Sequence, residues 1–282
     1  MTAAFLPILA LLLAGQSAGD DPLPRAGVTV SCMYGRYSNQ TRSPALTVFG
    51  DMAFPERYIA TLGYQSLWLS NASSVWRSFH QDLISARLST GLTERMNASV
   101  YYSWLHEGEI PGFVPAFIFH FMGADANARV ADLVNIGASY TVSVSAGRRT
   151  SSALRVYGNV ATDGRVLLSI NALGSKASQS LLDAAAPSQA WTPQLFFLEG
   201  DVSVPLGERY SADLSAGIGR RVFAYDEAPL IAYNQREIMT GRSILSGNIG
   251  LSETVTLLPS LEYDVFEGYT ILYSTIGCTF RF

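Results

Sequence analysis

The chain has 282 residues and a formal net charge of −4, and charged residues make up only 15% of it, against roughly 25% in typical soluble proteins. Aromatic residues reach 11% and the mean hydropathy is +0.18, a combination that points toward lipid. Lys176 is the single lysine among 19 basic residues, and no basic cluster is present, which argues against binding of nucleic acid.

The N-terminal segment has the features of an export signal. Residues 3–14, AAFLPILALLLA, form an apolar run that is followed by the small residues of GQSAG. We therefore predict a signal peptide over 1–19, cleaved after Ala18 or one residue later. The run is too short for a membrane anchor, and Gln16 stands where a lipoprotein signal would need cysteine. The remaining chain, 20–282, suits one barrel or sandwich domain.

After the signal peptide, apolar residues alternate with polar ones over many short segments. No later run approaches the ~18 apolar residues that a spanning helix needs. A closed antiparallel transmembrane β-barrel fits, because lipid offers no partner to an open sheet edge. A soluble sandwich is the alternative, but its strands average about 5 to 6 residues, whereas these segments run to about 9 to 13. We therefore predict an all-β barrel that lies in the bacterial outer membrane.

The pattern predicts fourteen strands, and an even number returns both ends of the chain to the periplasmic side. The weakest segment is 113–121, because Pro115 cannot donate a hydrogen bond to a neighbouring strand. Loss of this strand and a neighbour would leave twelve. The predicted strands are 28–37, 45–54, 58–68, 79–91, 97–106, 113–121, 132–144, 152–162, 165–174, 193–204, 209–221, 242–251, 255–263 and 269–282.

The breaks between the strands are of two kinds, as expected for short periplasmic turns and longer external loops. We expect the external loops at 69–78, 175–192 and 222–241. The short turns are Pro55-Glu56-Arg57, Thr93-Glu94-Arg95-Met96, Thr162-Asp163-Gly164, Pro205-Leu206-Gly207-Glu208 and Ser252-Glu253-Thr254.

The final segment, TILYSTIGCTFRF at 270–282, alternates strictly between an apolar and a polar face and ends in Phe282. It resembles the terminal strand of bacterial outer-membrane barrels, which the barrel-assembly machinery recognises by a final aromatic residue. In length and pattern the chain also resembles small porin-like barrels of the exopolysaccharide-associated type. The resemblance implies a Gram-negative outer-membrane location, contact with membrane lipid, and Phe282 as the assembly signal. We expect a monomer.

The polar faces of the predicted strands direct charged residues toward the lumen. These side chains either line an aqueous passage or pair with one another and fill the interior. We favour a narrow channel for small hydrophilic solutes or for polymer export, because twelve to fourteen strands leave room for one. The predicted lumen-lining residues are Arg87, Arg155, Glu199, Asp201, Asp213, Arg221, Arg242, Glu262, Asp264 and Arg281.

Few residues could support catalysis. His80 and Asp82 share one face of a strand near the external rim, which makes them weak candidates for a lipid hydrolase. We interpret His106 with Glu107 as a loop pair and His120 as an inward-facing packing residue. The sequence contains no spacing typical of a metal site or a phosphate-binding loop, so no cofactor is predicted and an enzyme is not favoured.

A further alternative is an adhesion or structural barrel that acts through the loops at 175–192 and 222–241. Deleting those loops without changing conductance would favour this role.

The two cysteines fall in the first and last predicted strands, which are neighbours in a closed barrel. Cys32 and Cys278 should both face outward at similar depth, where direct opposition would bring them close to the geometry of a disulfide. Two unpaired lipid-facing thiols are the alternative, because a register shift of two residues would separate them.

Overall fold

In the computed structural model the chain is described over residues 25–54, 58–70, 78–108, 117–145, 148–162, 166–178, 190–222 and 238–282. The predicted signal peptide at 1–19 lies outside these residues. So do Pro115, the turn at 55–57, and most of the predicted external loops at 69–78, 175–192 and 222–241. No helix among the described residues is long and apolar enough to cross a membrane.

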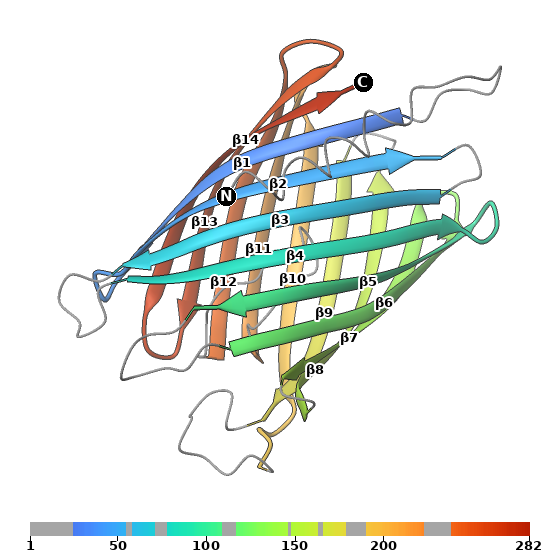
Figure 1. The fold of residues 1–282 in the computed structure, drawn as a ribbon. Coiled ribbons are helices and arrows are strands. Elements are labelled where there is room, and N and C mark those ends of the chain that lie inside the picture. Colours follow the sequence, from blue (N-terminus) through green and yellow to red (C-terminus); the bar gives the residue numbers. More distant parts are fainter. Residues whose placement is uncertain are drawn as a thin grey trace.

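The described residues form one closed antiparallel barrel of fourteen strands, in which each strand pairs with its neighbours in the chain and β1 pairs with β14 (Figure 1). The predicted strand number and closure are confirmed. The strands are β1 (Arg25–Tyr37), β2 (Arg42–Ala53), β3 (Tyr58–Ser70), β4 (Ser78–Gly91), β5 (Met96–Glu107), β6 (Phe117–Ala131), β7 (Val134–Ser145), β8 (Arg148–Thr162), β9 (Val166–Ala177), β10 (Leu195–Pro205), β11 (Tyr210–Val222), β12 (Ile238–Gly250), β13 (Val255–Phe266) and β14 (Thr270–Arg281).

The strands are long enough to cross a bilayer at a tilt. They contain 11 to 15 residues, and at ~3.3 Å per residue and a tilt of about 45° they span roughly 25 to 35 Å. The start of β1 and the C-terminus lie at the same end of the barrel, at the upper right of Figure 1. We call this end periplasmic, because single-chain outer-membrane barrels keep both termini there.

The sixth strand differs from the prediction. β6 begins at Phe117 and continues to Ala131, whereas the sequence pattern placed a strand at 113–121 and a break after it. The segment MGADANARVA reads as a loop because its outward residues are small and its inward residues are polar. Pairing with β5 and β7 keeps this segment in the sheet, with Asp125 opposite both Ser99 and Ser139. Neighbouring strands therefore override weak local strand preference here.

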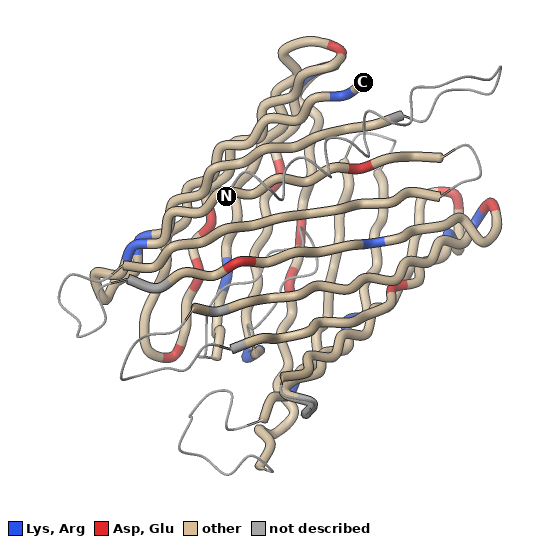
Figure 2. Tube along the Cα trace, viewed as in Figure 1, with Lys and Arg blue, Asp and Glu red and all other residues tan. Residues whose placement is uncertain are grey.

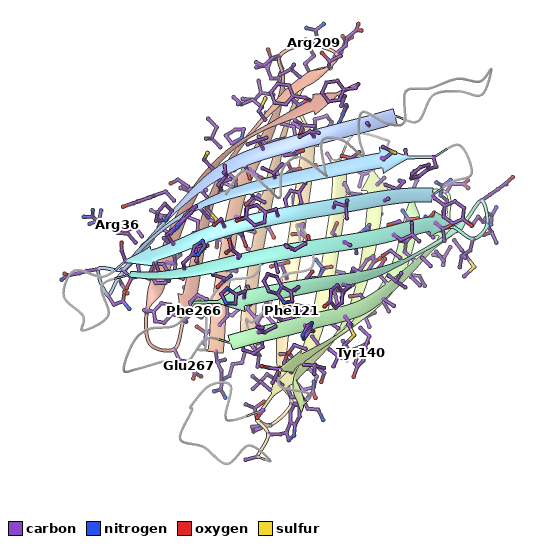
Figure 3. The ribbon with its side chains drawn as sticks, viewed as in Figure 1. Arg36, Phe121, Tyr140, Arg209, Phe266 and Glu267 are labelled. Atoms are coloured by element: carbon purple, nitrogen blue, oxygen red, sulfur yellow. The ribbon has the colours of Figure 1, made fainter. Side chains whose placement is uncertain are left out.

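The outer surface of the barrel is apolar. Along β11, Leu214 and Ile218 have exposed fractions of 55% and 74%, while Asp213 and Ser215, on either side of Leu214, line an interior cavity. Figure 2 shows long stretches of most strands without a charged residue. In Figure 3, Tyr140 and Arg209 project away from the barrel, whereas Phe121 lies within its outline. A continuous apolar outer face with a mixed interior is the pattern of a barrel in lipid.

Five inward-facing aromatic rings pack closely against glycines on the adjacent strand. A methyl group on any of these glycines would overlap the ring, so the close approach requires glycine at each position. Each ring therefore lies close to the backbone of the barrel wall and occupies part of the lumen. The pairs are Tyr273 with Gly35, Phe49 with Gly63, Tyr101 with Gly123, Tyr157 with Gly137, and Phe197 with Gly217.

The pairing of β1 with β14 decides between the two alternatives for the cysteines in favour of unpaired thiols. Cys32 is the partner of Ile276, and Cys278 is the partner of Val30, so the cysteines are offset by two residues and both are free. Both share the outward face with exposed neighbours, Tyr34 on β1 and Phe280 on β14, as predicted. The shear of the closed barrel sets this offset, which cannot be deduced from counting residues to the strand ends.

This register predicts a specific crosslink. In a chain carrying Ile276→Cys and Cys278→Ser, the new thiol lies directly opposite Cys32, where β-carbons are about 4.5 to 5.5 Å apart. A short bifunctional thiol reagent should join the two cysteines in most molecules, and proteolysis followed by mass spectrometry should detect the linked peptides. The wild-type pair should crosslink much less. Equal crosslinking of the wild type would contradict the register.

Candidate functional site

The external half of the lumen is filled by apolar side chains. We call this set the external cluster, and its residues come from both sides of the barrel, including Leu67 on β3 and Phe197 on β10, seven strands apart in the ring. Their exposed fractions are only 1% and 3%. The cluster consists of Met33, Tyr37, Ala45, Leu67, Leu69, Phe197, Met239, Phe266, Ile271 and Tyr273.

Buried apolar residues continue onto β4, β5 and β6. Leu83 on β4, Leu105 on β5 and Phe121 on β6 have exposed fractions of 1%, 2% and 1%. Inward-facing side chains of an open, water-filled lumen would be accessible to solvent. Their near-complete burial therefore means that side chains occupy the lumen in its external half.

A cavity lies below the external cluster, toward the periplasmic end. Its volume is about 690 Å³ and its lining comes from nine strands, β1, β2 and β8 to β14. Polar side chains such as Asn171 and Asn248 line it together with apolar ones such as Phe49 and Ile244. The lumen thus has two parts, the external cluster on the external side and, on the periplasmic side, this cavity of mixed lining, which we call the vestibule.

The principal charge cluster lies where these two parts meet. The Arg242 guanidinium donates to Glu262 through both Nε, at 2.9 Å, and a terminal nitrogen. Its Nε is 3.5 Å from Asp264 Oδ1. The side chains of Arg242 and Asp264 are 6% and 0% exposed, so this ion pair network is buried. Arg242 on β12 faces two carboxylates of β13, so it links these two neighbouring strands at the external edge of the vestibule.

Two other vestibule carboxylates, Asp201 and Asp213, accept hydrogen bonds from neighbouring strands. Asp201 accepts from Ser215 and from Asn171, the latter at 2.9 Å, and Asp213 accepts from Ser203. Asn248 also donates to Asp213 at 3.3 Å. These bonds fix the acidic groups against the wall and leave the space between opposite walls to the cavity.

The predicted lumen residues lie at several levels of the structure. Arg155, Glu199, Asp201, Asp213, Arg242 and Glu262 line the vestibule. Arg87 lies over the ring of Tyr101 at 5.5 Å, and Arg221 lies over Phe197 at 5.6 Å, where each guanidinium packs on an aromatic face. Asp264 is buried beside Arg242, whereas Arg281 is exposed at the periplasmic end of β14.

His80 and Asp82 belong to a hydrogen-bonded group on the outer face rather than in the lumen. Ser66 Oγ is 2.8 Å from His80 Nε2 and donates to Asp82 Oδ1 at 3.0 Å. Tyr64 donates to the same carboxylate at 2.7 Å, and the His80 ring stacks on Trp68 with centroids 5.3 Å apart. The even-numbered residues of β4 face outward here, as the exposure of Ile84 shows.

The geometry of this group differs from that of a hydrolytic triad. In a triad the acid contacts the imidazole nitrogen opposite the one that faces the serine. Here Asp82 approaches Nε2, at 3.4 Å, the same nitrogen that contacts Ser66. Ser66 is also only 2% exposed, which leaves little access for a substrate. The group is better explained as a set of polar side chains that satisfy one another on a surface that faces the membrane.

Two interpretations of histidines were wrong. His120 faces outward, where its Nδ1 lies 2.7 Å from the Tyr102 hydroxyl. His106 is part of β5 rather than a loop, and its ring stacks on Trp104 with centroids 5.7 Å apart. Alternating patterns identify the two faces of a strand but not which face meets lipid when both contain aromatic residues. Among the described residues, no group of three or more His, Cys, Asp or Glu is placed to hold a metal ion.

Comparison with known proteins identifies the fold but not a family. No family model and no curated protein matches the chain. Among solved structures, the Ralstonia pickettii toluene transporter TbuX has a TM-score of 0.56 at 8% identity, covering 92% of this chain and 88% of that one. The monoaromatic hydrocarbon channel CymD gives 0.55 at 9%, with coverage of 92% and 88%. The Pseudomonas putida toluene transporter TodX gives 0.51 at 9%, with 94% and 89%.

At these identities the likeness concerns the fold alone. The chain has the fold of bacterial outer-membrane β-barrels, and its apolar outer surface agrees with that location. Neither a specific porin-like family nor the exopolysaccharide-associated type is identified by these comparisons.

The sequence interpretation missed the external cluster. Its residues are apolar on a face that was expected to be polar, as in QSLWLS at 65–70, where Leu67 and Leu69 point inward beside Gln65. A signal was present, because apolar residues on both faces in the external halves of several strands indicate a filled lumen. The hydrogen-bonding role of Ser66 was also missed, since it lies on a different strand from His80.

Proposed function

We propose that this protein is an outer-membrane channel in which the external cluster limits the passage of solutes. The observation that carries the proposal is the vestibule of about 690 Å³, which is lined by charged residues of the lumen and ends against buried apolar side chains from opposite walls. Hydrophobic constrictions gate channels by excluding water. In this account the vestibule collects solutes, and transient displacement of the apolar side chains allows passage.

Small uncharged solutes suit this arrangement best. An ion would lose much of its hydration shell among the apolar side chains of the external cluster, whereas an uncharged molecule loses less. The neighbours TbuX and CymD, named for toluene and monoaromatic hydrocarbons, share only the fold and do not identify the solute. Our expectation from sequence, a channel for hydrophilic solutes, is thereby narrowed to those without charge.

Polymer export is less well supported, because an extended polymer needs a continuous passage through the external half. For a role in adhesion, the predicted loops at 175–192 and 222–241 lie largely outside the described residues. Lipid hydrolysis is disfavoured by the placement of Asp82 and by the burial of Ser66.

Assembly through Phe282 is part of the proposal. Its backbone N–H donates to the Ala26 carbonyl at 2.9 Å, and its side chain is 75% exposed. An exposed terminal ring next to the closing strand pair is available to the barrel-assembly machinery. The folded barrel is proposed to act as a monomer in contact with outer-membrane lipid.

Swelling of proteoliposomes tests the solute class. Liposomes that contain the refolded protein should swell in small uncharged solutes and should respond much less to charged solutes of similar size, because the constriction penalises charge. Protein-free liposomes give the baseline. Equal permeation of charged and uncharged solutes would contradict an apolar constriction, and no swelling in either would contradict the channel.

A further inference from the structure

A groove on the outer face of the barrel carries an inference that is independent of the lumen. The groove runs over β7 to β11 and has a volume of about 790 Å³, within the range of roughly 300 to 1,000 Å³ typical of ligand sites. One wall is formed by Tyr140 and Leu154 and the other by Phe196 and Ile218, with exposed fractions of 44%, 51%, 70% and 74%.

The floor of the groove results from small residues on β9. Ala172 and Gly174 occupy successive outward positions between the larger side chains of β8 and β10, with Leu154 the register partner of Gly174 and Leu198 that of Ala172. A side chain at Gly174 would meet Gln194 Nε2 at 2.9 Å and the Phe196 ring at 3.7 Å. The small residues at these two positions therefore form the floor of the groove, which is about one side chain deep and has apolar walls.

The external end of the groove is positively charged. Lys176, the only lysine of the chain, is the second-last residue of β9 and lines the groove together with Gln194. Its ammonium group lies 5.6 Å from the centre of the Trp191 ring, which orients it at the rim.

The groove extends along the strands from the external rim toward their middle, the depth that a lipid of the outer leaflet occupies. Its charged end is at the external rim, and its apolar part extends to Val156 and Leu198, toward the middle of the strands. A ligand that fits has an anionic head near the membrane surface and an acyl chain below it. Ammonium and guanidinium groups bind phosphate, and exposed apolar walls accept a chain.

We propose that this groove binds the phosphorylated, acylated glycolipid of the outer leaflet. One acyl chain lies over Ala172 and Gly174, and a phosphate contacts Lys176. The proposal depends on the outer-membrane location and does not depend on whether the lumen conducts.

Native mass spectrometry of the detergent-solubilised, delipidated barrel tests the proposal, with purified lipid A as the probe. The wild type should retain one lipid A under conditions that remove unspecific lipid. Lys176→Gln should weaken retention by about tenfold, as for loss of one hydrogen-bonded charge. Ala172→Leu, which fills the groove while keeping the surface apolar, should weaken it at least as much.

Ala86→Leu is the matched control, because Ala86 also lies on the outer face, between Ile84 and Leu88, but is on β4, three strands away from β7 at the edge of the groove. This variant should bind lipid A like the wild type. Equal retention by all four proteins would overturn the site. A preference for phosphatidylglycerol over lipid A would overturn the assignment to the outer-leaflet glycolipid. Heat-dependent gel migration of each variant verifies that the barrel is folded.

Discussion

Removing the external cluster should open the lumen. In the double variant Leu67→Ala with Phe197→Ala, which truncates side chains on opposite walls, we expect the single-channel conductance in planar bilayers to rise several-fold. The physical reason is that water and ions can occupy a lumen whose apolar side chains no longer meet. Phe197 is 3% exposed and Leu67 is 1% exposed, so each truncation creates internal space rather than changing the lipid-facing surface.

The matched control truncates apolar residues that face lipid. Leu88 and Leu214 have exposed fractions of 48% and 55% and lie on β4 and β11. A Leu88→Ala and Leu214→Ala chain should conduct like the wild type. If the lumen variant leaves the conductance unchanged while remaining folded, the external cluster is not the constriction.

Removing Arg242 should strongly destabilise the barrel. In Arg242→Ala the buried carboxylates of Glu262 and Asp264 lose the guanidinium that lies between them, at 2.9 Å and 3.5 Å from its Nε. Breaking a buried ion pair by removing one partner destabilises by about 3 to 5 kcal/mol. The free energy of unfolding, measured by reversible urea denaturation in detergent micelles or lipid vesicles, should fall by that order.

Neutralising the whole cluster provides the control. The triple variant Arg242→Met, Glu262→Gln and Asp264→Asn contains no buried charge, so it should recover much of the stability that Arg242→Ala loses. A loss equal to that of Arg242→Ala would show that the effect comes from packing alone. No loss in Arg242→Ala itself would contradict the buried network.

The number of strands, and which residues of most strands face outward, could be predicted from the sequence because both depend on local alternation. β11 is the clearest case, where Leu214 and Ile218 face outward and Asp213 and Ser215 face inward, as predicted. The predicted strand ends agreed less closely with the structure. β6 was misplaced because Gly123, Ala124 and Ala126 provide little local strand preference.

Features that depend on the register between strands, or on contacts across the lumen, could not be predicted from alternation along the chain. The offset of Cys32 and Cys278 follows from the shear of the closed ring, and the contact of Ser66 with His80 follows from the register of β3 against β4. The external cluster joins residues of β1 to β3 with residues of β10 and β12 to β14. Which side chains meet across a lumen depends on the cross-section of the barrel. The alternation of residues along single strands does not specify this cross-section.

Planar bilayer recording of the wild-type protein tests the central claim most directly. After insertion of barrel that migrates as folded on a gel, we predict discrete, brief openings of small unit conductance, because passage requires apolar side chains from opposite walls to separate. Large, sustained conductance steps would show that the lumen is open and that the external cluster does not constrict it. A silent bilayer, together with liposomes that contain the folded protein and do not swell in small uncharged solutes, would contradict the channel.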